Sequence, residues 1–322
     1  MNKITHDYIQ YYQDLKRPLK WKVTDKRIIM TIASIYALNQ KPLHVESFLD
    51  LANKVRNSAS YISVLRSTSR YTTAALLDVK FHNPDEKIQE LHHTYNLFRE
   101  EKFKSGVFTY IAASVLLTNP KQNPKLVIQK AKEVYDGMKK EHSFLTTSSD
   151  YPLATLLALD YKTGIISTIE ELYDELSRYG FRKGNDLQFM SQILALSIND
   201  SKNTLVNRAI HVMDSLQHTG IKPKKMYYPI IGMLALLPQN DFIVHEIIST
   251  YEDLNSQGDF KWQKDMNIIL ASNFFLMDKL THEGLAETSL YTILETVLQA
   301  QQAVMAAAVY SGDGGASGDG GS

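Results

Sequence analysis

The strongest candidate for a reactive or ligand-binding site in this sequence is a cluster of hydroxyl and carboxyl side chains. It lies at residues 146–152, Thr-Thr-Ser-Ser-Asp-Tyr-Pro. Ser148 or Ser149 beside Asp150 could act as a nucleophile, or the segment could bind an anion at a helix start, where free N–H groups are available. The same residue types also cap helices, because a Ser or Asp side chain accepts a bond from a first-turn N–H. Since no Gly-x-Ser-x-Gly motif surrounds the serines, we favour capping.

Comparable polar positions recur further along the chain at predicted helix starts. If successive units stack, these starts line one edge, and helix N-termini with lysines favour a carboxylate, a phosphate or an acidic peptide. The candidate ligand rim comprises Ser148, Ser149, Asp150, Tyr151, Arg182, Lys183, Asp186, Tyr227, Tyr228, Lys264 and Asp265, with Lys222, Lys224, Lys225 and Lys261 nearby. The alternative is a solvated edge that binds nothing.

Metal and cofactor chemistry has little support in the sequence. The ten histidines include the adjacent pair His92 and His93, but neighbouring residues on a helix point about 100° apart and do not chelate one ion. No HExxH motif and no glycine-rich phosphate loop followed by a helix is present. We therefore predict no metal, no cofactor and no catalytic residue.

The elements that must position the candidate rim follow from a repeat of about 40 residues. Apolar anchors recur 37 to 41 residues apart at Val23, Ile62, Phe103, Phe144, Phe181, Ile221 and Phe260. Each anchor precedes an apolar segment such as IASIYAL at 32–38, and a charged amphipathic segment follows, such as IISTIEELYDELSRYG at 165–180. This alternation predicts an all-α fold: a right-handed α-solenoid-like array of about seven helical hairpins, similar to HEAT or TPR arrays.

Two further features refine that prediction. Eleven residues after the anchors stand Ser34, Thr73, Ser114, Thr155, Gln192, Gly232 and Ala271, of which six are small. A small residue at one place on each helix would let neighbouring helices approach closely. Trp21 and Trp262 each lie two residues from an anchor, and we interpret them as packing residues.

The ends of the chain differ from its middle. We divide the sequence into a capping helix at 1–20, the helical array at 21–284, a C-terminal helix at 285–310 and a disordered Gly, Ser and Asp tail at 311–322. An array needs such a cap because its terminal apolar face must be covered. The C-terminal helix either packs on the last unit or pairs with a second copy to form a homodimer.

Composition narrows the possible partners and the compartment. Lys plus Arg and Asp plus Glu number 35 each, so the net charge is zero, which argues against a nucleic-acid or anionic-lipid partner. Cysteine is absent, and neither a secretory signal nor an apolar stretch of about 18 residues is found. We expect a cytoplasmic protein with no membrane partner.

Several phrases resemble one family. SSDYPLA at 148–154, FRKGNDLQF at 181–189, MYYPIIGMLALL at 226–237, FKWQKDMN at 260–267 and QAQQA at 299–303 resemble uncharacterised cytoplasmic proteins of Bacillus-like bacteria. That family is known as domain of unknown function number four thousand and three. The resemblance covers nearly the whole chain and implies no activity, cofactor or catalytic residue.

Two functions remain open on the sequence. The first is a non-catalytic helical-repeat scaffold that binds a protein or peptide, since curved helical arrays expose long recognition surfaces. The alternative is an enzyme or a sensor of a small anionic ligand, with its site near Ser148, Asp150 and the lysine-rich rim. An enzyme is the less favoured of the two.

Overall fold

The computed structural model describes residues 1–119, 122–197, 200–277 and 279–280. In this part of the chain fourteen α-helices and four short 3-10 turns follow one another, with no strand among them. The all-α prediction is therefore confirmed. The predicted helix at 285–310, its homodimer and the tail at 311–322 lie outside the described residues.

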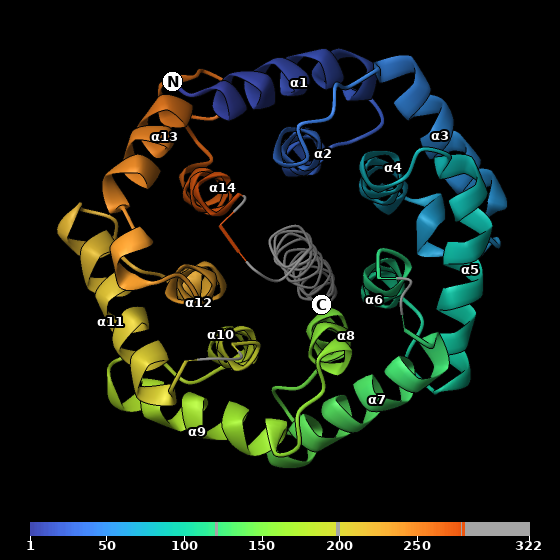
Figure 1. Cartoon of the computed structure of the whole chain (residues 1–322). Coiled ribbons are helices and arrows are strands. Elements are labelled where there is room, and N and C mark those ends of the chain that lie inside the picture. The colour runs from blue at the N-terminus through green and yellow to red at the C-terminus, as the bar shows by residue number, and fades with distance from the viewer. Residues whose placement is uncertain (120–121, 198–199, 278, 281–322) are drawn as a thin grey trace, which may run out of the picture.

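The helices form two concentric rings (Figure 1). The outer ring holds α1 (Lys3–Leu19), α3 (Val45–Ser58), α5 (Pro84–Glu100), α7 (Pro124–Glu141), α9 (Ile165–Arg178), α11 (Lys202–His218) and α13 (Val244–Ser256). The inner ring holds α2 (Lys26–Leu38), α4 (Ser69–Lys80), α6 (Val107–Leu117), α8 (Tyr151–Leu159), α10 (Asn185–Ala195), α12 (Tyr228–Ala235) and α14 (Lys264–Leu276). The chain alternates between the rings, so each outer helix is followed by an inner one.

Side-chain patterns explain which helices lie inside. Every residue of α2 from 28 to 38 is buried, because this helix packs on all sides. Helix α9 instead buries one stripe, formed by Ile169, Leu172, Tyr173 and Leu176, and presents its charged residues to solvent. These are the patterns expected of a helix enclosed by neighbours and of an amphipathic helix that covers them.

The two ends of the helical array meet. The ring of Tyr8 in α1 lies 5.4 Å from that of Phe260 and 5.3 Å from that of Phe274 in α14. On the surface of the same junction, Lys16 forms an ion pair of 2.6 Å with Asp259. The expected capping helix is thus an outer helix of a closed ring (Figure 1), in which each end of the array covers the apolar face of the other.

The buried anchors are only partly those predicted. Val23, Phe103, Phe181 and Phe260 are buried, whereas Ile62 and Phe144 are 97% and 96% exposed. In the loop of Ile62 the core position is filled by Leu65, which is completely buried. The periodic spacing therefore marks equivalent loops correctly but does not identify the core side chain in each.

The tryptophans also lie on the surface, so their interpretation as packing residues is wrong. Trp21 is 89% exposed and Trp262 is 78% exposed. Their neighbours Val23 and Phe260 take the buried positions of the same loops.

The small residues of the inner helices do permit close packing. A Cβ atom on Gly232 of α12 would lie 3.1 Å from Met190 Cγ and 3.4 Å from the Met190 carbonyl oxygen of α10. The equivalent residues Ser34, Thr155 and Ala271 are completely buried. At Gly232, at least, the absence of a side chain sets the distance between neighbouring helices.

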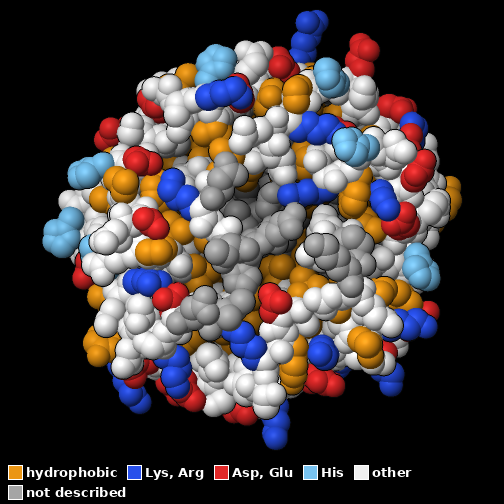
Figure 2. Space-filling view, viewed as in Figure 1, with side chains coloured by type: hydrophobic (Ala, Val, Ile, Leu, Met, Phe, Trp, Pro, Cys, Tyr) orange, Lys and Arg blue, Asp and Glu red, His pale blue; other side chains and the backbone are white. Residues whose placement is uncertain are grey.

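Charge is mixed around the ring. Figure 2 shows one face of the molecule, where acidic and basic side chains alternate along the perimeter. No helix in the described ranges is long and apolar enough to cross a membrane.

Candidate functional site

Seven loops each connect an outer helix to the inner helix that follows it. We call this set the outer-to-inner rim: residues 20–25, 59–68, 101–106, 142–150, 179–184, 219–227 and 257–263. The inner-to-outer loops, which include residues 39–44, 81–83 and 160–164, form the opposite rim.

Contacts between one loop and the start of the next inner helix place the outer-to-inner loops on one side of the ring. The backbone N–H of Lys104 donates to the Tyr151 hydroxyl at 3.2 Å, and that of Arg182 donates to the Tyr228 hydroxyl at 3.0 Å. The same type of link joins Ser63 to Tyr110 at 3.3 Å, Thr146 to Gln188 at 2.8 Å, Lys224 to Asp265 at 2.6 Å, and the Asp259 carbonyl to Lys26 at 2.8 Å. Each link reaches one unit further round, and the last one crosses the ring closure.

Residues 147–150 form a helix cap. The Thr147 hydroxyl accepts from the Ser149 N–H at 3.3 Å, and the Asp150 carboxylate accepts from the Thr147 N–H at 2.8 Å. This is a capping box on the short turn Ser148–Asp150 that precedes α8. The capping interpretation holds, with Thr147 rather than a serine in the N-cap position.

Asp150 is nevertheless unusual for a capping residue. It is 4% exposed, and its second carboxylate oxygen accepts from Gln192 Nε2 at 2.6 Å. Burial raises its pKa from 3.8 to about 6, against the opposing effect of the hydrogen bonds from Gln192 and Thr147. The residue therefore joins the loop to α10 and titrates in a range where most carboxylates are already charged.

The other candidate residues bind neighbouring units rather than one centre. Tyr227 donates a short hydrogen bond to Asp265, which also accepts from Lys224. Burial and that bond raise the pKa of the Tyr227 phenol. Burial likewise raises the pKa of Asp186, while nearby Lys225 opposes the rise. Asp150 thus bonds Thr147 and Gln192, Asp186 lies near Lys225, and Tyr227 bonds Asp265. Among the described residues, the three side chains therefore take part in three separate junctions.

Tyr151 and Tyr228 repeat one packing arrangement. Each begins an inner helix and is followed by proline. The ring of Tyr151 lies 4.7 Å from that of Phe103, and the ring of Tyr228 lies 5.0 Å from that of Phe181. These two candidates are largely buried, and they link units through their rings and hydroxyl oxygens.

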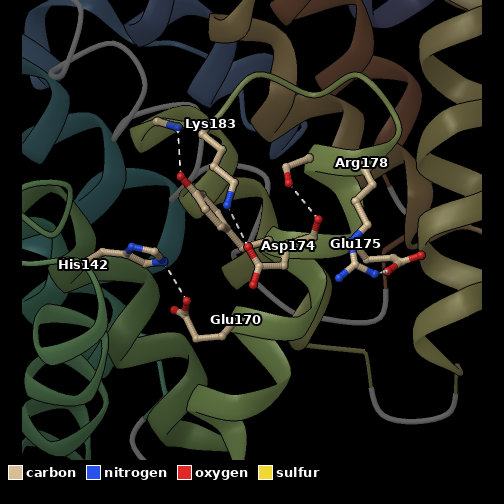
Figure 3. A network of polar contacts seen from close by, with 9 residues as sticks. His142, Glu170, Asp174, Glu175, Arg178 and Lys183 are labelled. Carbon is tan, nitrogen blue, oxygen red and sulfur yellow. Dashed lines mark hydrogen bonds and ion pairs between the residues drawn. The ribbon is translucent and has the colours of Figure 1, made fainter.

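Arg182, Lys183 and Lys264 are exposed. Figure 3 shows Lys183 paired with Asp174 of α9, at 2.9 Å. The hydrogen bond from Lys183 lowers the pKa of Asp174. Beside this pair, His142 Nε2 lies 2.6 Å from Glu170, whose pKa is raised by burial. These side chains connect the loop at 142–150 to α9 and to the loop at 179–184.

One small cleft opens beside Tyr151. It has a volume of about 110 Å³ and is lined by Lys102, Phe103, Lys104, Lys132, Tyr135, Asp136, Lys139 and Tyr151. Lys132 is paired with Asp136 at 2.5 Å, and the other three lysines, Lys102, Lys104 and Lys139, line the cleft together with three aromatic residues. An anion is the ligand that such a lining suits. The cleft escaped the sequence analysis because its lysines come from α7 and from the loop at 101–106, which meet only in the fold.

The family model for proteins of unknown function DUF4003 matches residues 11–303. The chain belongs to this family. It is 34% identical over 315 residues to the uncharacterised protein YeaA of Bacillus subtilis strain 168, and the match covers 97% of this chain and 95% of YeaA. No solved structure matches.

Membership of DUF4003 confirms the resemblance seen in the sequence and supplies no activity. In the described part of this DUF4003 chain, no group of three or more His, Cys, Asp or Glu side chains is placed to hold a metal ion.

The outer-to-inner rim differs sharply from the opposite rim in this DUF4003 protein. The five most exposed large apolar side chains among the described residues all lie on it: Trp21, Tyr61, Ile62, Phe144 and Trp262, from 78% to 97% exposed. The most exposed on the opposite rim are Ile243 at 45% and Tyr161 at 38%. An isolated exposed apolar residue needs no explanation, but these five all lie on the same side of the ring.

Proposed function

We propose that this DUF4003 protein is a non-catalytic scaffold, a ring of helical hairpins that docks on a partner surface through its outer-to-inner rim. The observation that carries the proposal is the gathering of the five most exposed large apolar side chains on that rim. These residues stabilise no core, and their exposure to water is unfavourable until something covers them. The sequence predicted a protein or peptide partner. The docking role itself does not depend on the class of partner.

The candidate residues at the helix starts support a scaffold more than an enzyme. Asp150, Tyr227 and Asp265 are engaged in junctions between units. An enzyme needs acids, bases or nucleophiles that converge on a reacting atom. These side chains instead fix the loops and so hold the exposed residues of the rim in place.

Site-specific photocrosslinking in the native host tests the docking role. A photoreactive amino acid replaces Phe144 or Tyr61 on the rim, and in the matched control it replaces Tyr161 on the opposite rim. We expect discrete adducts, with protein or with lipid, from the two rim positions and none from position 161. Equal labelling from both rims, or none from positions 144 and 61, would contradict the proposal.

A second candidate function rests on the cleft beside Tyr151. Its lysines and aromatic rings suit a small anion such as a phosphate or carboxylate. The sequence predicted the site of a small-anion sensor elsewhere, near Ser148, Asp150 and the lysine-rich rim, and of its candidate residues only Tyr151 lines this cleft. Calorimetric titration with inorganic phosphate tests this second function. We expect saturable binding that is weakened about tenfold by the double change Lys104→Ala and Lys139→Ala. Lys222→Ala with Lys225→Ala, on another loop, is the control and should leave the affinity unchanged.

A further inference from the structure

We propose that the outer-to-inner rim docks on the surface of an anionic membrane, with its exposed aromatic and aliphatic side chains inserted at the level of the lipid headgroups. This inference rests on the proposed docking function and names the partner. It departs from the expectation, drawn from the overall charge, that no membrane partner exists.

The first argument is the chemistry of the exposed side chains. Two tryptophans, a tyrosine, a phenylalanine and an isoleucine project from four loops of the rim at 78% to 97% exposure. Trp and Tyr favour the boundary between water and hydrocarbon, because their rings are apolar and their N–H or O–H groups remain hydrated. Both tryptophans of the chain belong to this set.

The second argument is charge. The seven outer-to-inner loops contain eleven Lys and Arg residues and four Asp and Glu residues. The described residues of the inner-to-outer loops, at 39–44, 81–83, 118–119, 122–123, 160–164, 196–197, 200–201 and 236–243, contain two lysines and three aspartates. The zero net charge of the chain therefore conceals a strongly basic rim. Each basic residue near an anionic leaflet adds to the attraction.

Two of the four acids of the rim are paired with cations of the protein itself, and a third is buried. Asp25 is paired with Arg27, and Asp259 is paired with Lys16. Asp150 is buried and bonded to Gln192. Two of the eleven basic side chains, Lys183 and Lys224, are themselves paired with Asp174 and Asp265 of the adjoining helices, so the attraction to an anionic surface comes mainly from the others.

Cations lie directly beside the exposed rings. Lys20 Nζ is 5.1 Å from the ring of Trp21, Lys261 Nζ is 5.2 Å from that of Trp262, and the Arg66 guanidinium is 4.8 Å from that of Tyr61. An aromatic ring with an adjacent cation can place the ring among acyl chains and the charge among phosphates.

The arrangement favours a membrane over a folded protein partner. The five exposed residues project from four loops at different points of the ring, and the loops at 20–25 and 257–263 are neighbours across its closure. A protein partner would need a separate matching pocket for each residue. A bilayer is planar on this scale and accepts an apolar side chain at any point.

Vesicle binding by the full-length protein tests the inference. Vesicles contain phosphatidylcholine alone, or phosphatidylcholine with about 30 mol % phosphatidylglycerol as the anionic lipid. Tryptophan fluorescence is the main readout, because Trp21 and Trp262 are the only tryptophans and both lie on the rim. Flotation of the vesicles gives the bound fraction independently.

We expect a blue shift of the emission and flotation with the anionic vesicles, at an apparent affinity at least about tenfold above that for phosphatidylcholine. The double change Ile62→Ser and Phe144→Ser should weaken binding about tenfold. Lys20→Glu with Lys261→Glu should weaken it by a similar factor and reduce its salt dependence. Because these four side chains are exposed, circular dichroism should show unchanged folding.

The matched control is Tyr161→Ser with Ile243→Ser on the opposite rim, which should leave the affinity within about twofold. The membrane inference is overturned by absence of binding to anionic vesicles, by flotation without a blue shift, or by an equal loss in the control. If the rim positions crosslink to a protein and the vesicles are not bound, the proposed docking function stands and the proposed membrane partner is rejected. Absence of rim adducts of any kind would reject both.

Discussion

At the scale of single residues, burial separates side chains that hold the ring together from those that serve its surface. Phe260 and Trp262 are two positions apart in one loop, yet Phe260 is completely buried and Trp262 is 78% exposed. Burial also differs between neighbouring polar residues, since Asp150 is buried at the end of a segment of threonines and serines. These differences lead to two predictions.

Replacing Phe260 with alanine should lower the free energy of unfolding by about 3 to 5 kcal/mol. Its ring contacts Tyr8 and Tyr12 of α1 at centroid distances of 5.4 Å and 4.6 Å, so the change removes aromatic contacts across the ring closure. Phe144→Ala is the matched control, because Phe144 is 96% exposed, and it should change stability by less than about 0.5 kcal/mol. Urea unfolding measures both. Similar losses in the two variants would contradict the structure.

Asp150 should make stability depend on pH. Its pKa is about 6 in the folded protein and 3.8 in the reference state, so the folded protein holds the extra proton between these values. Below pH 3.8 the carboxyl is protonated in both states, and the contribution of Asp150 to the free energy of unfolding is at its maximum. As the pH rises from 3.8 through about 6, the unfolded state ionises first, and the free energy of unfolding falls by roughly 3 kcal/mol in all.

The variant Asp150→Asn tests this sign. Asparagine keeps one acceptor oxygen and no charge, as the protonated carboxyl does, so the variant should lack the decline between pH 4 and 6. Urea unfolding of both proteins across that range isolates the contribution of Asp150. A variant whose stability follows the wild-type curve in parallel would show that Asp150 does not titrate there.

At the scale of helices, the sequence was sufficient for the order and type of the elements. Enclosed inner helices such as α2 and amphipathic outer helices such as α9 have clearly different patterns, and glycines 180 and 220 follow outer helices with positive φ angles of 94° and 86°. Ile62 and Phe144 were misassigned because spacing alone cannot show which of several apolar loop residues turns inward. The cleft lined by Lys104 and Tyr135 forms only where the loop at 101–106 meets α7. Neither segment contains a sequence motif that predicts it.

The packing of α10 against α12 depends on Gly232. Gly232→Val should destabilise the protein by about 2 kcal/mol, because its first added carbon would already lie 3.1 Å from Met190 Cγ and two methyl groups follow. Gly258→Val is the control, since an added Cβ there meets nothing within 4 Å. Thermal unfolding compares the two. Equal transition temperatures would show that α10 and α12 can separate at no cost.

At the scale of the whole molecule, the arrangement of charge matters more than its sum. An equal number of acidic and basic residues argued against a lipid partner, yet the fold places eleven basic residues against four acidic ones in the loops of one rim. That asymmetry could not be obtained from composition, because it depends on which loops share a side of the ring. Hydrogen bonds such as that from Lys104 to Tyr151 show that successive outer-to-inner loops lie on the same side of the ring.

The closure of the ring between α1 and α14 also determines how the molecule should come apart. A stack of hairpins with two free ends can lose units one at a time, because an end unit has a single neighbour. Here the contact of Tyr8 with Phe260 and Phe274 gives the first and last units a neighbour on each side.

We therefore expect one cooperative unfolding transition, in which circular dichroism and hydrogen exchange of the first and last helices report the same free energy. Tyr8→Ala should weaken the junction and let α1 and α14 exchange well before the rest, while Tyr61→Ala, at an exposed position, should not. Independent early exchange of α1 in the wild-type protein would contradict this expectation. In this molecule, joining the two ends converts local fraying into an all-or-none event.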